Sequence, residues 1–193
     1  MPTVCEKINA LENHVLTRQL RVAQALGERF TAARRDDALS ESGFVILNVG
    51  LAYFEMIEQF ESGETSVRRS GDFFKRGFNR VYPASSVSPE DVSRIWKSVR
   101  NGMYHVAMPT DRCGLSRHLG CAFAIENGAL VINPAKLIDD LIAHFSTYCQ
   151  ELRDGGHCQL QKNFERMFDR LGSDAPTTSQ PNTSNTPVPY VIS

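Results

Sequence analysis

The segment Arg100-Asn101-Gly102-Met103-Tyr104-His105 places a permanent cation, an amide, a phenol and an imidazole within six residues. Histidine transfers protons near neutral pH, because its ordinary pKa is about 6.5. Arginine carries a fixed charge on a planar fork that matches phosphate oxygens. Cleavage of RNA without a metal needs a base for the 2′-hydroxyl proton, an acid for the leaving oxygen and a cation for the phosphorane charge. The segment therefore suits phosphate chemistry, with Arg100 and His105 as catalytic residues and Asn101 supporting them.

The surroundings of this segment are basic, although the whole chain has a net charge of −1. Between residues 66 and 105 there are eight Arg or Lys residues and three Asp or Glu residues. A local basic region with aromatic side chains is typical of a site for an RNA backbone. The alternative interpretation is that these basic residues lie on solvated helix faces. The expected RNA-binding side chains are Arg68, Arg69, Lys75, Arg76, Arg94, Lys97 and Tyr104.

Helical geometry limits what one chain can do with this segment. Residues five apart in a straight α-helix, at about 100° each, point about 140° away from each other. Arg100 and His105 would therefore not converge on one phosphate. Either the helix deforms at Gly102, or the catalytic set is completed across the two-fold interface of a homodimer, where each residue occurs twice.

An Arg followed by a polar residue and then by His, near the end of an amphipathic helix, resembles the R-x(4–6)-H motif of the HEPN superfamily. The residues that carry the resemblance are Arg100, Asn101 and His105. The resemblance implies a metal-independent endoribonuclease without a cofactor, acting on RNA as a homodimer whose two motifs face each other. Many members are toxins of toxin–antitoxin systems, with an antitoxin as partner, or effectors of phage defence. Other members have lost catalysis and serve in binding.

A second stretch, Arg112 to His118, fits the same spacing. It lies in a loop rich in Pro and Gly, and its Arg is followed by Cys113 rather than by a polar residue. The motif at Arg100 instead belongs to a helix with a clear beginning: Ser88 is a typical cap and Pro89 suits the first helical position. The apolar stripe of this helix leaves Arg100 at its rim, whereas Arg94, Lys97 and Asn101 fall on the outer side.

Hydrophobic periodicity predicts helices throughout most of the chain. The first helix begins at Val4 after a capping box of Thr3 and Glu6, and the second is apolar nearly all round, with Glu55 and Glu58 interpreted as a solvated edge. An Asn-Gly turn predicts a β-hairpin. The expected segments are helices at 4–35, 40–60, 72–80 and from Ser88, a loop at 109–120, a hairpin at 122–132, and helices from Pro134 and after Gly156.

The sequence thus predicts an all-α fold: a helical bundle of five to six helices with one short inserted β-hairpin. Residues 1–172 would form this HEPN-like domain. Residues 173–193 are rich in Ser, Thr, Pro and Asn, which predicts a disordered tail.

Composition favours a cytoplasmic protein that does not contact membranes. The N-terminus lacks the apolar stretch of a signal peptide, and five scattered cysteines fit reduced thiols better than a disulfide framework. Two alternatives to the ribonuclease stay open. One is a non-catalytic helical module that binds a protein or nucleotide through its second helix. The other is a small regulator with a zinc ion on Cys113, His118 and Cys121, although the expected site contains no metal.

Overall fold

The N-terminal segment forms one long helix that the sequence predicts from its capping box. The computed structural model describes residues 2–32, 38–83 and 87–173. The amide of Glu6 donates to Oγ1 of Thr3, and the amide of Thr3 donates to the Glu6 carboxylate. The helix is described as far as Ala32, and the last expected residues lie outside the described part. It consists of α1 (Val4–Glu12), the π-helical stretch η1 (Asn13–Leu20) and α2 (Arg21–Ala32).

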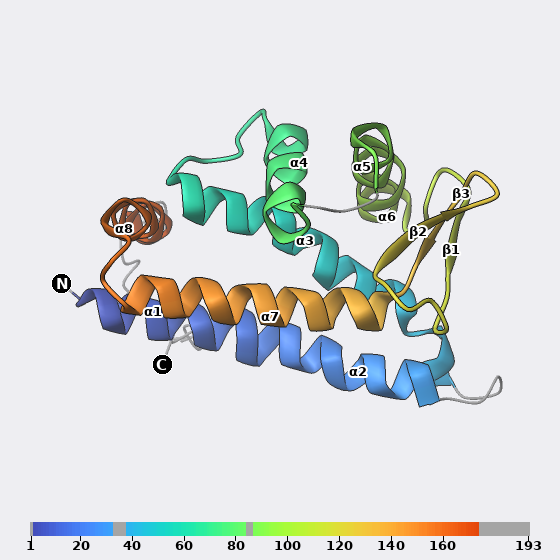
Figure 1. Cartoon of the computed structure of the whole chain (residues 1–193), viewed down its shortest axis with the longest axis horizontal. Helices are drawn as coiled ribbons and strands as arrows, with labels where there is room; N and C mark the ends of the chain where they lie inside the picture. Colours follow the sequence, from blue (N-terminus) through green and yellow to red (C-terminus); the bar gives the residue numbers. More distant parts are fainter. Residues whose placement is uncertain (1, 33–37, 84–86, 174–193) are drawn as a thin grey trace, which may run out of the picture.

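Helix α3 (Gly43–Ser62), preceded by a short 3-10 turn η2 (Ala38–Glu41), lies at the centre of the fold. No charged residue occurs between Gly43 and Phe54, and Phe54 is completely buried. In Figure 1, α3 begins behind the right-hand end of α7 (Pro134–Arg153) and then runs obliquely above it, while α7 runs antiparallel to the N-terminal helix. The prediction of a helix buried on two sides is confirmed for most of its length, but Phe44 and Val45 near its start are exposed.

Helix α4 (Ser70–Val81) packs tightly against α3. Phe73, Phe74 and Phe78 are completely buried. Gly77 lies so close to the backbone of Phe54 that an added Cβ would sit 1.8 Å from the Phe54 carbonyl oxygen. The two helices can approach this closely only because position 77 has no side chain.

The helix that carries the predicted site is continuous and begins where the sequence predicts. The amide of Asp91 donates to Oγ of Ser88 over 3.1 Å, and Pro89 occupies the first helical position. The predicted inward stripe is buried at Val92, Ile95, Val99 and Met103, whereas its fifth member, Trp96, is partly buried. The parts of this helix are α5 (Pro89–Arg94), the π-helical turn η3 (Ile95–Arg100) and α6 (Asn101–Val106).

A small sheet covers one end of the helices (Figure 1). The predicted hairpin is confirmed, with Asn127 and Gly128 both at positive φ in its turn. A third strand pairs parallel with the hairpin in the region that the sequence predicts as a loop, so that prediction is wrong for Cys113–Leu115. Arg94 fixes this strand from outside, because its guanidinium donates to the carbonyls of Arg112 and Gly128. The strand order is β1 (Cys113–Leu115), β3 (Ala129–Ile132), β2 (Phe123–Glu126).

The chain is therefore mainly helical with a small β element. Asn133 caps α7 by accepting from the amides of Ala135 and Lys136. The last helix, α8 (Cys158–Ser173), packs on α3, and includes the residue at which the expected tail begins. Residues 174–193, the rest of that tail, lie outside the described residues. Among the helices described, none is long and apolar enough to cross a membrane.

A partly buried histidine of α7, which contacts Tyr53 of α3, gives the fold a pH dependence. Oη of Tyr53 lies 2.8 Å from Nδ1 of His144. Burial, and secondarily the charge of Arg80, lowers the pKa of His144 below its ordinary value. The unfolded chain therefore binds the proton more readily than the folded chain. We expect the part of the stability that depends on neutral His144 to be lost as the pH falls below about 6.5.

Urea denaturation between pH 7.5 and 5 checks this expectation. As the pH is lowered, the free energy of unfolding should decrease less steeply in His144→Phe than in the wild type. His118→Phe is the matched control, because His118 is exposed and should leave the slope unchanged. Equal slopes in the wild type and His144→Phe would contradict the assignment.

Candidate functional site

The helix deforms next to the predicted motif, but one turn earlier than Gly102. In η3 the amide of Asn101 donates to the carbonyl of Trp96, five residues before it, which is the bond of a π-helical turn. From Asn101 the backbone is α-helical again. The wide turn therefore changes the direction in which the Arg100 side chain leaves the helix, relative to the residues before it. It does not bring Arg100 and His105 onto the same side, because α-helical geometry still separates them by about 140°.

Gly102 has a different role from the one that the sequence suggests. It is buried, and an added Cβ would lie 2.6 Å from the carbonyl oxygen of Met108. The chain turns back beside α6 after Ala107, which ends the helix at positive φ, and the amide of Thr110 donates to the carbonyl of Ser98. The glycine thus allows the returning segment to lie against the helix, and the last turn of α6 is left at the surface.

Arg100 is held by three neighbouring groups. Its Nη2 donates to Oε2 of Glu55 over 3.0 Å, and its Nη1 donates to Oδ1 of Asn101 over 3.1 Å. Its guanidinium carbon also lies 5.3 Å from the ring centroid of Tyr104, within the range of a cation–π contact. The side chain is 25% exposed, as its expected position at the rim of the buried stripe requires.

His105 is exposed on the last turn of α6. Its ring lies edge-on to Tyr104, with 5.5 Å between the centroids, and Tyr104 is itself 73% exposed. Within the described chain, no hydrogen bond or ion pair is found for the imidazole. The predicted catalytic residues are thus a partly buried, oriented cation and an accessible imidazole on different sides of one helix, and the ring of Tyr104 contacts both.

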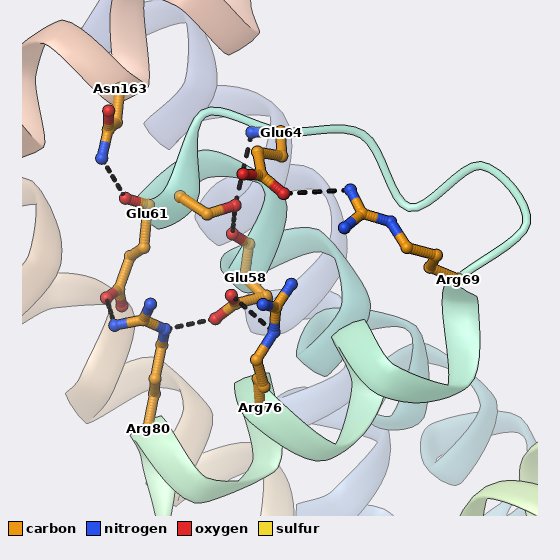
Figure 2. A network of polar contacts seen from close by, with 8 residues as sticks. Glu58, Glu61, Glu64, Arg69, Arg76, Arg80 and Asn163 are labelled. Atoms are coloured by element: carbon orange, nitrogen blue, oxygen red, sulfur yellow. Dashed lines mark hydrogen bonds and ion pairs between the residues drawn. The ribbon is translucent and has the colours of Figure 1, made fainter.

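Three of the six predicted RNA-binding cations have acidic partners, which the sequence analysis missed. Figure 2 shows Arg69 paired with Glu64 and Arg76 paired with Glu58. Glu58, which also binds Arg80, is 1% exposed, so the interpretation of Glu58 as a solvated edge is wrong. The third paired cation of the predicted set is Arg94, with Asp111; the predicted catalytic residue Arg100 is paired with Glu55.

Three cations of the predicted set keep their charge uncompensated within the described ranges. Arg68 and Lys97 are exposed, and Lys75 is partly buried; no ion pair is found for any of them there. The uncompensated positive charge of the basic region is therefore smaller than the charge count along the sequence indicates.

The cysteines do not form the predicted alternative zinc site. Among the described residues, no group of three His, Cys, Asp or Glu side chains is arranged to hold a metal ion. Burial raises the pKa of the Cys113 thiol to about 11, which disfavours the thiolate that zinc binds. Cys121 is exposed, and its thiol contacts the carbonyl of Phe123.

Comparison with known proteins adds no relative. The chain matches no protein-family model, no curated protein and no solved structure.

Proposed function

We propose that this protein is an HEPN-like, metal-independent endoribonuclease, with residues 1–172 as its domain. The observation that carries the proposal is the state of the two motif residues, Arg100 at the end of η3 and His105 on α6. Arg100 is fixed by Glu55 and Asn101, and the imidazole of His105 is open to a ligand five residues later. Cleavage of a phosphodiester by its own 2′-hydroxyl requires a fixed cation and an accessible proton-transfer group at one phosphate, which a two-fold-related copy of the chain would bring together.

The reaction consists of one displacement at phosphorus. A base removes the 2′-hydroxyl proton, the 2′-oxygen attacks the phosphorus, and the 5′-oxygen leaves with a proton from an acid. The products are a 2′,3′-cyclic phosphate and a 5′-hydroxyl. Arg100 stabilises the charge on the non-bridging oxygens, and His105 transfers one of the protons.

A homodimer supplies the second proton-transfer group. Each chain contributes one imidazole to this surface, whereas the reaction needs both a base and an acid. Two copies related by a two-fold axis would present two Arg100–His105 sets to one RNA strand. A cytoplasmic toxin or phage-defence effector, controlled by an antitoxin or another regulatory protein, is the biological role that we propose for such an enzyme.

Incubation of the purified full chain with single-stranded RNA in EDTA tests the proposal. We expect fragments to appear at a rate that EDTA does not change. RNA that stays intact, or cleavage that EDTA abolishes, would contradict the proposed function.

The ion pairs predict a modest salt dependence of RNA binding. For single strands, the logarithm of the affinity falls by about 0.7 per neutralised phosphate for each unit of log salt. The three unpaired cations predict a slope near −2 per chain, whereas eight free cations would give about −6. Fluorescence anisotropy at increasing salt measures this slope.

Two variants make the salt measurement specific. Lys97→Ala should reduce the slope by about 0.7, because Lys97 is exposed and unpaired among the described residues. Arg76→Ala should leave it unchanged, because Glu58 already neutralises Arg76. A larger effect of Arg76→Ala than of Lys97→Ala would show that the ion pairs open on binding.

A further inference from the structure

Glu55 contacts the proposed catalytic arginine from another helix. It lies on α3, forty-five residues before Arg100, and accepts a hydrogen bond from Nη2 of that residue over 3.0 Å. Its side chain is 16% exposed and that of Arg100 is 25% exposed. By comparison, the Arg69–Glu64 pair is 51% exposed on both sides. The Glu55–Arg100 contact is therefore much better shielded from water than an ordinary surface ion pair.

Because the contact is shielded from water, it can help to fix the orientation of the Arg100 guanidinium. An arginine side chain loses rotamer entropy when it is held in one orientation, and a surface ion pair seldom offsets that loss. Here the Glu55 carboxylate, the side-chain oxygen Oδ1 of Asn101 and the ring of Tyr104 together restrict the orientation of the guanidinium. Arginine has five N–H donors, and these two hydrogen bonds use one on each Nη. Donors are thus left for phosphate oxygens while the guanidinium plane stays fixed.

We propose that Glu55 is a positioning residue of the ribonuclease site, which acts on the reaction only through Arg100. This inference rests on the proposed function. In this role the carboxylate accepts no proton from RNA; it holds the guanidinium so that its remaining N–H groups meet the transition-state oxygens without reorganisation. The contact also partly compensates the charge of Arg100, so orientation rather than raw attraction is what Glu55 contributes.

Two substitutions separate positioning from proton transfer. Glu55→Gln keeps an acceptor oxygen for Nη2 but cannot act as a base, whereas Glu55→Ala removes both. We expect Glu55→Ala to reduce kcat by about 10-fold to 100-fold, since a small misplacement of a catalytic group has effects of this size. Glu55→Gln should keep most of kcat, with the pH–rate profile of the wild type. KM should change little in either variant, because the unpaired cations that attract RNA are intact.

Two outcomes would overturn this role. If Glu55→Gln were as inactive as Glu55→Ala and had lost the acidic limb of the profile, Glu55 would be the base. If Glu55→Ala kept the wild-type kcat, the contact would have no influence on the site. Glu64→Ala is the matched control, since it removes the carboxylate of an exposed pair with Arg69 and should leave kcat unchanged.

A readout that does not depend on activity keeps the two proposals distinguishable. In ¹H–¹⁵N NMR spectra of the full chain, Arg100 should show separate Nη resonances, because two of its donors are fixed; Arg100→Lys assigns them. These resonances should average in Glu55→Ala and persist in Glu55→Gln. Averaged resonances in the wild type would overturn the role of Glu55. Separate resonances in a chain that does not cleave RNA would support the fixed arginine and overturn the proposed function alone.

Discussion

Replacing His105 with Ala should reduce RNA cleavage by about 10²-fold to 10⁴-fold, the usual contribution of a general acid or base. The side chain is exposed on the last turn of α6, and no contact that would stabilise the fold is found for it within the described chain, apart from the ring of Tyr104. The loss should therefore appear in kcat without a change in thermal stability. Single-turnover cleavage of a labelled RNA and a thermal melt of the same preparation measure the two quantities.

His118→Ala is the matched control for this substitution. His118 is also exposed, and it ends the second stretch with the same kind of spacing, which begins at Arg112. The His118→Ala variant should cleave RNA at the wild-type rate. If His105→Ala retained full activity, or if both variants lost activity equally, His105 would not be the proton-transfer residue.

The second large effect is expected at Gly77, which is distant in sequence from the site. A Cβ at this position would lie 1.8 Å from the carbonyl oxygen and 2.7 Å from the carbonyl carbon of Phe54. Both atoms belong to the backbone of α3, so neither can move aside as a flexible side chain would. Gly77→Ala must therefore separate α3 from α4, and we expect the free energy of unfolding to fall by about 3 kcal/mol. This loss should outweigh the gain of about 1 kcal/mol in helix propensity.

Urea denaturation of Gly77→Ala and Gly156→Ala tests this packing argument. No atom lies within 4 Å of the Cβ position at Gly156, and its φ is not positive. Gly156→Ala should therefore be nearly neutral. Equal stability of the two variants would mean that α3 and α4 are not in such close contact.

The parts of the fold that depend on neighbours in sequence could be predicted. The caps at Thr3 and Ser88 and the hairpin turn at Asn127-Gly128 involve residues within three or four positions of each other. The residue types alone indicate such features. The buried stripe of the helix from Pro89 was likewise predictable, because one period of 3.6 residues describes it.

The parts that depend on distant residues could not be predicted. Glu55 and Glu58 look like ordinary polar positions near the end of a helix, yet each binds an arginine of another helix. Strand β1 is only three residues long and forms by pairing with β3. Nothing in its local sequence requires this pairing. The ion pairs of the predicted basic region could not be predicted for the same reason, since a count along the chain cannot include partners that only folding supplies.

The chemistry of the RNA ends tests the central claim most directly. The full-length chain is incubated with a defined single-stranded RNA in EDTA, and the fragments are analysed by mass spectrometry. The account predicts 2′,3′-cyclic phosphate and 5′-hydroxyl ends, because the 2′-oxygen is the nucleophile and Arg100 and His105 serve that attack. Fragments with 3′-hydroxyl and 5′-phosphate ends, or RNA that stays uncut, would contradict it.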